Sequence, residues 1–216
     1  MIHNLGEQNS IFNTYISELR DIHIQKDSMR FRRNLERIGE IMAYEISKKL
    51  NFASVPVETP LGQAEMQLPQ NEVVIGTILR AGLPYHQGFL NYFDRAQNLF
   101  VSAYRKHHKD NSFTIEIEYL SGPGLQNKTL ILVDPMLATG RSMVLALKAI
   151  TEHLGKPEHI HVASVIASEE GVDYTRARIP ENCTLWIGAI DPELNAKAYI
   201  VPGLGDAGDL AYGSKI

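Results

Sequence analysis

The chain has 216 residues, of which 44% are hydrophobic and 21% are charged. This composition is typical of a globular protein and excludes a disordered chain, a collagen and a coiled coil. The formal net charge of −4 argues against broad, nonspecific binding to nucleic acid, which needs a basic face. A small polyanionic ligand is still compatible with this charge, because a few local cations and backbone amides can hold phosphate groups.

The sequence also bears on where the protein works. Its single cysteine, Cys183, cannot form a disulfide within the chain, which fits a reducing cytoplasm. The first ten residues lack the apolar core of a signal peptide, and no run approaches the roughly 18 apolar residues that span a membrane. We therefore expect a cytoplasmic protein with neither a nucleic acid nor a membrane as its partner.

The N-terminal region predicts helical structure followed by two extended arms. Residues 11–50 are expected to be helical, with an apolar stripe at spacings of three and four formed by Phe31, Leu35, Ile38, Met42 and Ile46. Charged residues lie mostly off this stripe and predict a solvated or inter-subunit face: Arg30, Arg32, Arg33, Glu36 and Arg37. Residues 53–69 predict two short arms joined by a turn at Thr59-Pro60-Leu61-Gly62.

The remainder alternates between strand and helix patterns. The apolar run at 72–79 is typical of a strand buried on both faces of a parallel sheet, and residues 129–133, 160–167 and 185–190 predict further strands. Residues 99–120 predict a hairpin with a long tip. Helices are expected over 83–93, 142–154 and 169–177, whereas the glycine- and proline-rich tail from Asp191 predicts irregular structure.

These elements predict one α/β domain over residues 1–216. Its core, 70–190, is expected to be an open, mostly parallel, Rossmann-like sheet flanked by helices, with right-handed crossovers. Residues 1–69 would add an N-terminal helix and β-arm region, and residues 191–216 would add an irregular C-terminal hood.

The sharpest functional signal is the segment from Leu130 to Ser142, where four apolar residues end at Asp134 and a loop of small residues opens a helix. Such loops bind ligands at the carboxyl edge of open α/β sheets. Backbone N–H groups at the helix start, with the hydroxyls of Thr139 and Ser142, can surround a phosphate. Gly140 allows a close approach or an unusual φ. Asp134 is placed to accept hydrogen bonds from sugar hydroxyls.

The loop differs from two common phosphate motifs. It lacks the Gly-Lys-Ser/Thr ending of a Walker loop, and it is not a Gly-x-Gly-x-x-Gly segment. On spacing alone, a plain strand–turn–helix in which Asp134 and Thr139 act as caps remains an alternative.

Four ordered segments together carry a resemblance to a known family. The segment 133–140 resembles the phosphoribosyl-diphosphate (PRPP) signature of type I phosphoribosyltransferases, and its Asp-Pro is similar to the uracil branch. Residues 78–82 and 104–105 resemble the two arginine motifs of that family. Residues 199–209 resemble its C-terminal uracil-binding segment. The resemblance covers roughly residues 15–213 and also includes Arg30-Phe31-Arg32 and Glu58-Thr59-Pro60-Leu61-Gly62.

The resemblance implies a reaction: transfer of the 5-phosphoribosyl group from PRPP to N1 of uracil, giving UMP and diphosphate in pyrimidine salvage. Catalysis would rest on positioning and on stabilising the departing charge, without a side-chain nucleophile. Mg²⁺ would be the cofactor, held through PRPP oxygens and without an all-protein metal cage. The long N-terminal helix and the arms suggest a homodimer or larger assembly, and GTP activates some members of the family.

The resemblance also assigns roles to residues of this sequence. The catalytic set would be Arg80, Arg105, Asp134 and Asp206, with both arginines pairing with diphosphate oxygens. PRPP would be bound by Arg80, Arg105, Asp134, Pro135, Met136, Leu137, Ala138, Thr139, Gly140, Arg141, Ser142 and Asp206. Uracil would be bound by Ile200, Gly205, Asp206 and Ala207.

Two departures and three other interpretations remain at this stage. Arg141 replaces the usual second glycine of the loop, which is harmless or adds a phosphate-binding cation, and Leu210-Ala211-Tyr212 replace the usual basic and aromatic residues after Asp209. A transferase for a purine or orotate is disfavoured by residues 199–209. A non-catalytic, pyrimidine-responsive regulator on the same fold would need a basic RNA face. The last interpretation is a doubly wound domain that binds another phosphorylated metabolite.

Overall fold

The structure is a computed structural model that describes residues 1–107 and 113–214, and for 103–107 and 113–116 it describes the backbone alone. Within these residues, one sheet has the strand order β1-β10-β9-β7-β4-β5-β6, with β8 paired to β9. The strands are β1 Ile2–Asn4, β4 Val73–Leu79, β5 Gln97–His107, β6 Phe113–Ser121, β7 Thr129–Val133, β8 Met136–Leu137, β9 His159–Ser168 and β10 Cys183–Asp191. Every pairing is parallel except β5 with β6, so the open, mostly parallel sheet and its hairpin are confirmed.

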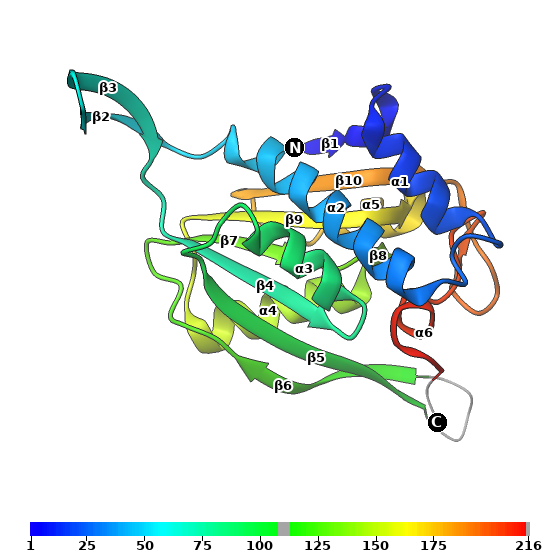
Figure 1. The fold of residues 1–216 in the computed structure, drawn as a ribbon. Helices are drawn as coiled ribbons and strands as arrows, with labels where there is room; N and C mark the ends of the chain where they lie inside the picture. Colours follow the sequence, from blue (N-terminus) through cyan, green and yellow to red (C-terminus); the bar gives the residue numbers. More distant parts are fainter. Residues whose placement is uncertain (108–112, 215–216) are drawn as a thin grey trace.

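Helices cover both faces of this sheet (Figure 1). On one face lie α1 Ile11–Arg20, α2 Ser28–Ser47 and α3 Gly82–Leu90, and on the other lie α4 Arg141–Leu154 and α5 Glu169–Arg176. Strand β7 shows why its run is continuously apolar: Ile131 and Val133 pack with the first group, and Leu130 and Leu132 pack with the second. Side chains alternate between the faces of a strand, so a strand buried on both sides needs apolar residues throughout.

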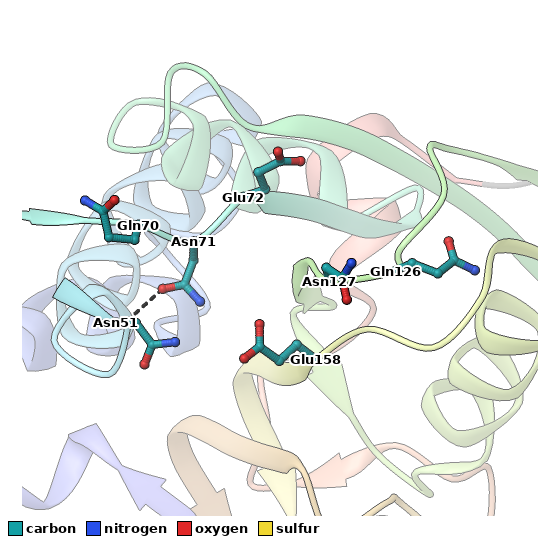
Figure 2. Close-up of a pocket in the computed structure, with 7 residues that line it drawn as sticks. All are labelled: Asn51, Gln70, Asn71, Glu72, Gln126, Asn127 and Glu158. Atoms are coloured by element: carbon teal, nitrogen blue, oxygen red, sulfur yellow. Dashed lines mark hydrogen bonds between the residues drawn. The ribbon is translucent and has the colours of Figure 1, made fainter. Parts of the chain in front are cut away.

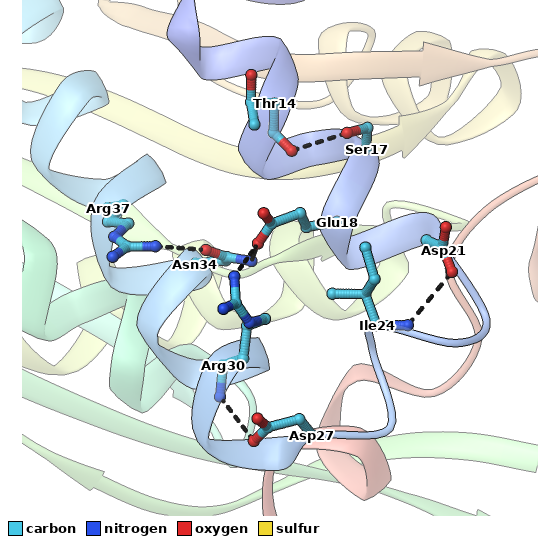
Figure 3. Close-up of polar contacts among 9 residues, drawn as sticks. All are labelled: Thr14, Ser17, Glu18, Asp21, Ile24, Asp27, Arg30, Asn34 and Arg37. Atoms are coloured by element: carbon cyan, nitrogen blue, oxygen red, sulfur yellow. Dashed lines mark hydrogen bonds and ion pairs between the residues drawn. The ribbon is translucent and has the colours of Figure 1, made fainter.

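The prediction of one helical region over 11–50 is wrong at 21–27, where the chain leaves α1 and re-enters as α2 (Figure 3). Asp27 caps α2 by accepting hydrogen bonds from the N–H groups of Met29 and Arg30 at 3.0 and 3.1 Å. Glu18 then ties the two helices together, because it accepts hydrogen bonds from Arg30 at 3.1 Å and from Asn34 at 2.7 Å. The five residues of the predicted stripe are all buried, which confirms the face of α2 that packs on the sheet.

The predicted arms form a two-stranded antiparallel ribbon of β2 Phe52–Thr59 and β3 Gly62–Pro69, which projects away from the sheet (Figure 1). The turn lies where the sequence predicts it, and the Thr59 hydroxyl donates to the carbonyl of Gly62 at 2.8 Å. Leu61 at its tip is fully exposed, as are large parts of Phe52, Met66 and Leu68.

Several short elements were not expected. The tail contains β11 Glu193–Leu194, β12 Ile200–Val201 and α6 Ala207–Tyr212, and the chain starts with β1 and a short 3-10 turn, Leu5–Glu7. Elements of two to six residues carry no measurable periodicity, and the partners of β1 and α6 lie far away in sequence. None of the described helices is both long and apolar enough to cross a membrane.

Candidate active site

The carboxyl ends of β4 and β7 bring two of the predicted segments together. These strands are parallel neighbours, with Thr77 paired to Val133, so Arg80 and Asp134 emerge at the same edge of the sheet. Helix α6 of the hood lies at this edge as well (Figure 1). The site therefore forms where an open α/β sheet ordinarily binds ligands.

The predicted phosphate loop, residues 134–142, is fastened to β9. The carbonyl of Pro135 accepts hydrogen bonds from the N–H groups of Val165 and Ile166 at 3.1 and 3.0 Å, and β8 continues this contact as a parallel pair. Leu137 is buried beneath the loop, whereas Arg141 is exposed at the first position of α4. The outward position of Arg141 explains how the loop accommodates a bulky residue there.

Gly140 combines both properties that the sequence suggests for it. Its φ is 71°, in the left-handed region, and a Cβ at this position would collide with the hydroxyl of Thr175 and lie 2.7 Å from the carbonyl oxygen of Gly171. Gly140 opens α4, whose first N–H groups have no carbonyl partner inside the helix. The Thr139 hydroxyl accepts only a long hydrogen bond of 3.5 Å from Arg141 N–H. This helix start therefore presents donors suited to an anion.

Asp134 is held within the loop, where its carboxylate accepts a hydrogen bond from Met136 N–H at 3.2 Å. Burial raises the pKa of Asp134 to about 7, and the Met136 contact opposes this only in part. Burial and the charge of Asp134 also raise the pKa of Tyr85, which is completely enclosed. A desolvated carboxyl group gains most from a ligand that supplies hydrogen-bond donors or a cation.

Ser168 supports the loop from below and was not predicted as part of the site. Its hydroxyl donates to the carbonyl of Ala138 at 2.6 Å and accepts from the N–H of Gly171 at 2.8 Å. Ser168 is fully buried and caps α5. Serine followed by Glu169 and Glu170 is a recognisable cap signal, but nothing in the sequence links this cap to Ala138.

Arg80 lies against the hood. Its Nη2 donates to Asp209 at 3.0 Å and to the carbonyl of Gly213 at 3.3 Å. A Cβ added to Gly208 would lie 3.5 Å from the same nitrogen, so this glycine leaves room for the guanidinium. Among the described residues, the buried Arg80 Nε finds no hydrogen-bond partner. The arginine thus retains a buried donor next to the loop edge.

The structure places the predicted uracil segment in the hood. Ile200 and Ala207 are both buried within the hood. Gly205 is exposed, with φ of 94°. Asp206 caps α6 by accepting a hydrogen bond from Asp209 N–H at 3.0 Å. The backbone of Arg105 belongs to β5, but its side chain lies outside the described residues, so its predicted role is not placed.

Arg32 corrects another expectation. It was predicted to lie on a solvated or inter-subunit face, but its guanidinium donates to the carbonyl of Ala211 in the hood at 2.7 Å. Arg33 does behave as predicted, since its half-exposed side chain pairs with Glu36 at 2.7 Å. One face of α2 therefore supports the C-terminal segment.

A separate pocket of about 360 Å³ lies at the opposite edge of the sheet (Figure 2). Its polar lining includes Glu72, Asn127 and Glu158, which precede β4, β7 and β9. It opens at the amino ends of the strands, so it is distinct from the site formed by Arg80 and Asp134.

Comparisons with known proteins agree with this geometry. A family model described as uracil phosphoribosyltransferase matches residues 7–214. A uracil phosphoribosyltransferase of Porphyromonas gingivalis is 58% identical over 213 residues, which cover 99% of this chain and 98% of that protein. The structure of the AQ2163 protein from Aquifex aeolicus matches with a TM-score of 0.87 at 29% identity over the whole of both chains.

A more distant likeness bears on the fold alone. The adenine phosphoribosyl transferase from Trypanosoma brucei matches with a TM-score of 0.56 at 10% identity, covering 88% of this chain and 83% of that one. The predicted type I phosphoribosyltransferase fold is thus confirmed. With the family model matching nearly the whole chain, the protein belongs to the uracil phosphoribosyltransferase family.

Proposed function

We propose that this protein transfers the 5-phosphoribosyl group of PRPP to N1 of uracil and releases diphosphate. The observation that carries the proposal is the meeting of three segments at one sheet edge. Arg80 follows β4, Asp134 follows the neighbouring β7, and the hood reaches Arg80 through Asp209 at 3.0 Å. The single buried Cys183 fits a reducing cytoplasm as the place of this reaction.

The loop would bind the 5′-phosphate. Backbone N–H groups at the start of α4 and the hydroxyls of Thr139 and Ser142 supply donors, and Asp134 would accept hydrogen bonds from the ribose hydroxyls. Arg80 and Arg105 would hold the diphosphate, since a planar guanidinium can bind two phosphate oxygens at once. Asp206 would act from the hood side of the same site.

The reaction breaks the bond between the anomeric carbon and the diphosphate oxygen and forms a bond from that carbon to uracil N1, which loses its proton. Positive charge builds on the ribose while negative charge builds on the leaving group. Arg80 would stabilise that negative charge, and the loop would fix the ribose at a distance suited to attack. These residues would supply charge stabilisation and positioning without a covalent intermediate.

The donor set also fits Mg²⁺. This ion commonly binds through one or two protein carboxylates together with substrate phosphates and water. Asp134 is one desolvated carboxylate at the loop, and the described residues bring together no group of three or more His, Cys, Asp or Glu side chains able to hold a metal. When bound with PRPP, the metal would neutralise diphosphate charge, and Asp206 would be the carboxylate near PRPP or a metal-bound water.

Assembly is part of the proposal. The ribbon of β2 and β3 exposes Phe52, Leu61, Met66 and Leu68 and packs on little of its own chain. An exposed two-stranded ribbon with apolar side chains is poorly stable alone, so we expect a second copy to cover it in a homodimer or larger assembly.

The test is an activity assay with purified protein, PRPP, Mg²⁺ and labelled uracil, with cytosine, orotate and hypoxanthine in parallel. UMP from uracil alone is the expected result. A product from another base would overturn the base assignment. No product from folded protein that binds PRPP, with or without added GTP, would favour a non-catalytic regulator.

A further inference from the structure

Arg20 and Asp191 form a partly buried ion pair between α1 and the hood, 171 residues apart in sequence. The Arg20 Nη2 donates to Asp191 Oδ1 at 2.7 Å, and Nη1 donates to Oδ2 at 2.8 Å. The Asp191 side chain is 6% exposed and that of Arg20 is 25% exposed. This two-point contact fixes the guanidinium plane relative to the carboxylate.

The same pair forms hydrogen bonds with both backbone groups of Gly203, its N–H and its carbonyl. Gly203 N–H donates to Asp191 Oδ2 at 2.8 Å, and Arg20 Nη1 donates to the Gly203 carbonyl at 3.0 Å. Gln25 extends the contact, because its Nε2 donates to the carbonyl of Leu204 at 3.2 Å and to the carbonyl of Leu19 in α1 at 2.8 Å. We call Arg20, Gln25 and Asp191 the α1 clamp.

The clamp decides where the neighbouring N–H groups point. In a trans peptide the carbonyl and the N–H point in opposite directions. Since the carbonyls of Gly203 and Leu204 face the clamp, the N–H groups of Leu204 and Gly205 face away from it. Gly205 is exposed, so its N–H is directed to the open side of the hood.

The backbone conformation of Gly203 excludes a side chain at this position. Its φ is 60°, and a Cβ would collide with the carbonyl of Ile200. Burial works to raise the pKa of Asp191, but the contacts from Arg20 and Gly203 outweigh it and lower that pKa, so the pair is charged at neutral pH. A charged pair fixes one geometry, which an apolar filling would not do.

We propose that Arg20 is a positioning residue for base recognition, which holds the hood backbone at Gly203 so that the following N–H groups meet uracil. This inference rests on the proposed function. It predicts that loss of the clamp weakens binding of the base while leaving binding of the 5′-phosphate intact.

The experiment compares two ligands and two matched variants by calorimetry. UMP fills the base and phosphate parts of the site, whereas ribose 5-phosphate fills the phosphate part alone. Arg20→Lys keeps a cation beside the buried carboxylate, so folding is preserved, but it removes the two-point contact. Arg30→Lys makes the same change at the half-exposed pair with Glu18, which ties α1 to α2 and makes no contact with Asp191 or Gly203 among the described hydrogen bonds (Figure 3).

Arg20→Lys is expected to weaken UMP binding roughly tenfold, which corresponds to about 1.4 kcal/mol. Its affinity for ribose 5-phosphate should change less than about twofold, as should both affinities in Arg30→Lys. Equal losses for both ligands in Arg20→Lys, or no loss, would overturn the inference. If the unaltered protein binds UMP no more tightly than ribose 5-phosphate, the proposed function itself fails first.

Discussion

Replacing Ser168 by alanine tests whether its hydrogen bond to Ala138 holds the conformation of the phosphate loop, residues 134–142. Ser168 is fully buried, and its hydroxyl donates to the Ala138 carbonyl and accepts from Gly171 N–H. The change to alanine removes both hydrogen bonds. Each buried group left without a partner costs about 1–3 kcal/mol, so the loss of both partners should lower the free energy of unfolding by about 2–6 kcal/mol. Urea denaturation measures this loss.

The effect on the site follows from the same hydrogen bond. With its carbonyl fixed on Ser168, the peptide after Ala138 directs the Thr139 N–H to the opposite side of the loop, where the phosphate is expected. Ser168→Ala should therefore raise the KM for PRPP about tenfold while kcat changes little. Ser17→Ala is the control, since Ser17 makes the same kind of bond, to the Thr14 carbonyl at 2.8 Å, on an exposed helix face (Figure 3). A Ser168→Ala protein that is destabilised but binds PRPP normally would refute the orienting role.

Three further predictions concern the same edge of the sheet. Gly140→Ala should weaken PRPP binding at least about tenfold, because a left-handed φ costs an L-residue roughly 1–2 kcal/mol and the new Cβ collides with Thr175; unchanged affinity by calorimetry would count against the loop geometry. The pKa of Asp134 is raised to about 7, so the stability gained by its protonation is present in acid and lost as pH rises through 7. Asp134→Asn should thus be more stable than the unaltered protein at pH 8 but not at pH 4. The unaltered protein should bind PRPP more tightly as Asp134 loses its proton between pH 6 and 8, because the carboxylate accepts hydrogen bonds from the ribose, and Asp134→Asn should lack this rise; parallel pH profiles for both proteins would contradict this. Arg80→Ala should lower kcat/KM about 10²–10³-fold, whereas Arg33→Ala, which removes another surface ion pair, should leave the rate unchanged, and equal rates for the two would remove Arg80 from the site.

The sheet and the loop could be predicted because their signals are local. Residues 130–133 are all apolar, which is typical of a strand covered on both faces. Gly140 follows the same logic, since a small residue before a helix indicates a tight turn. Signals of this kind depend on neighbours in sequence, so spacing is enough to find them.

The supports of the site could not be predicted in this way. Ser168 meets Ala138 across 30 residues, and Arg20 meets Asp191 across 171. No spacing rule connects such residues, because the contact exists only after the sheet has formed. Arg32 shows the consequence: its position off the apolar stripe predicts solvent, but the hood folds back and uses it. The prediction missed the break at 21–27 for a different reason. The cap residue Asp27 lies within a longer run of helix-forming residues, so it did not stand out as a helix start.

The two halves of the site have independent supports of different strength. The phosphate loop is tied to β9 through Pro135 and Ser168, and the hood is tied to α1 by a partly buried, two-point ion pair. They meet at Arg80 and Asp209, whose side chains are more than one third exposed, and exposed pairs of this kind contribute at most about 1 kcal/mol. We therefore expect that diphosphate can replace Asp209 on Arg80 at low cost without disturbing either support. Because the two supports are separate, Ser168→Ala should weaken binding of PRPP, whereas Arg20→Lys should weaken binding of the base. If both variants had identical effects, the loop and the hood would move as one body.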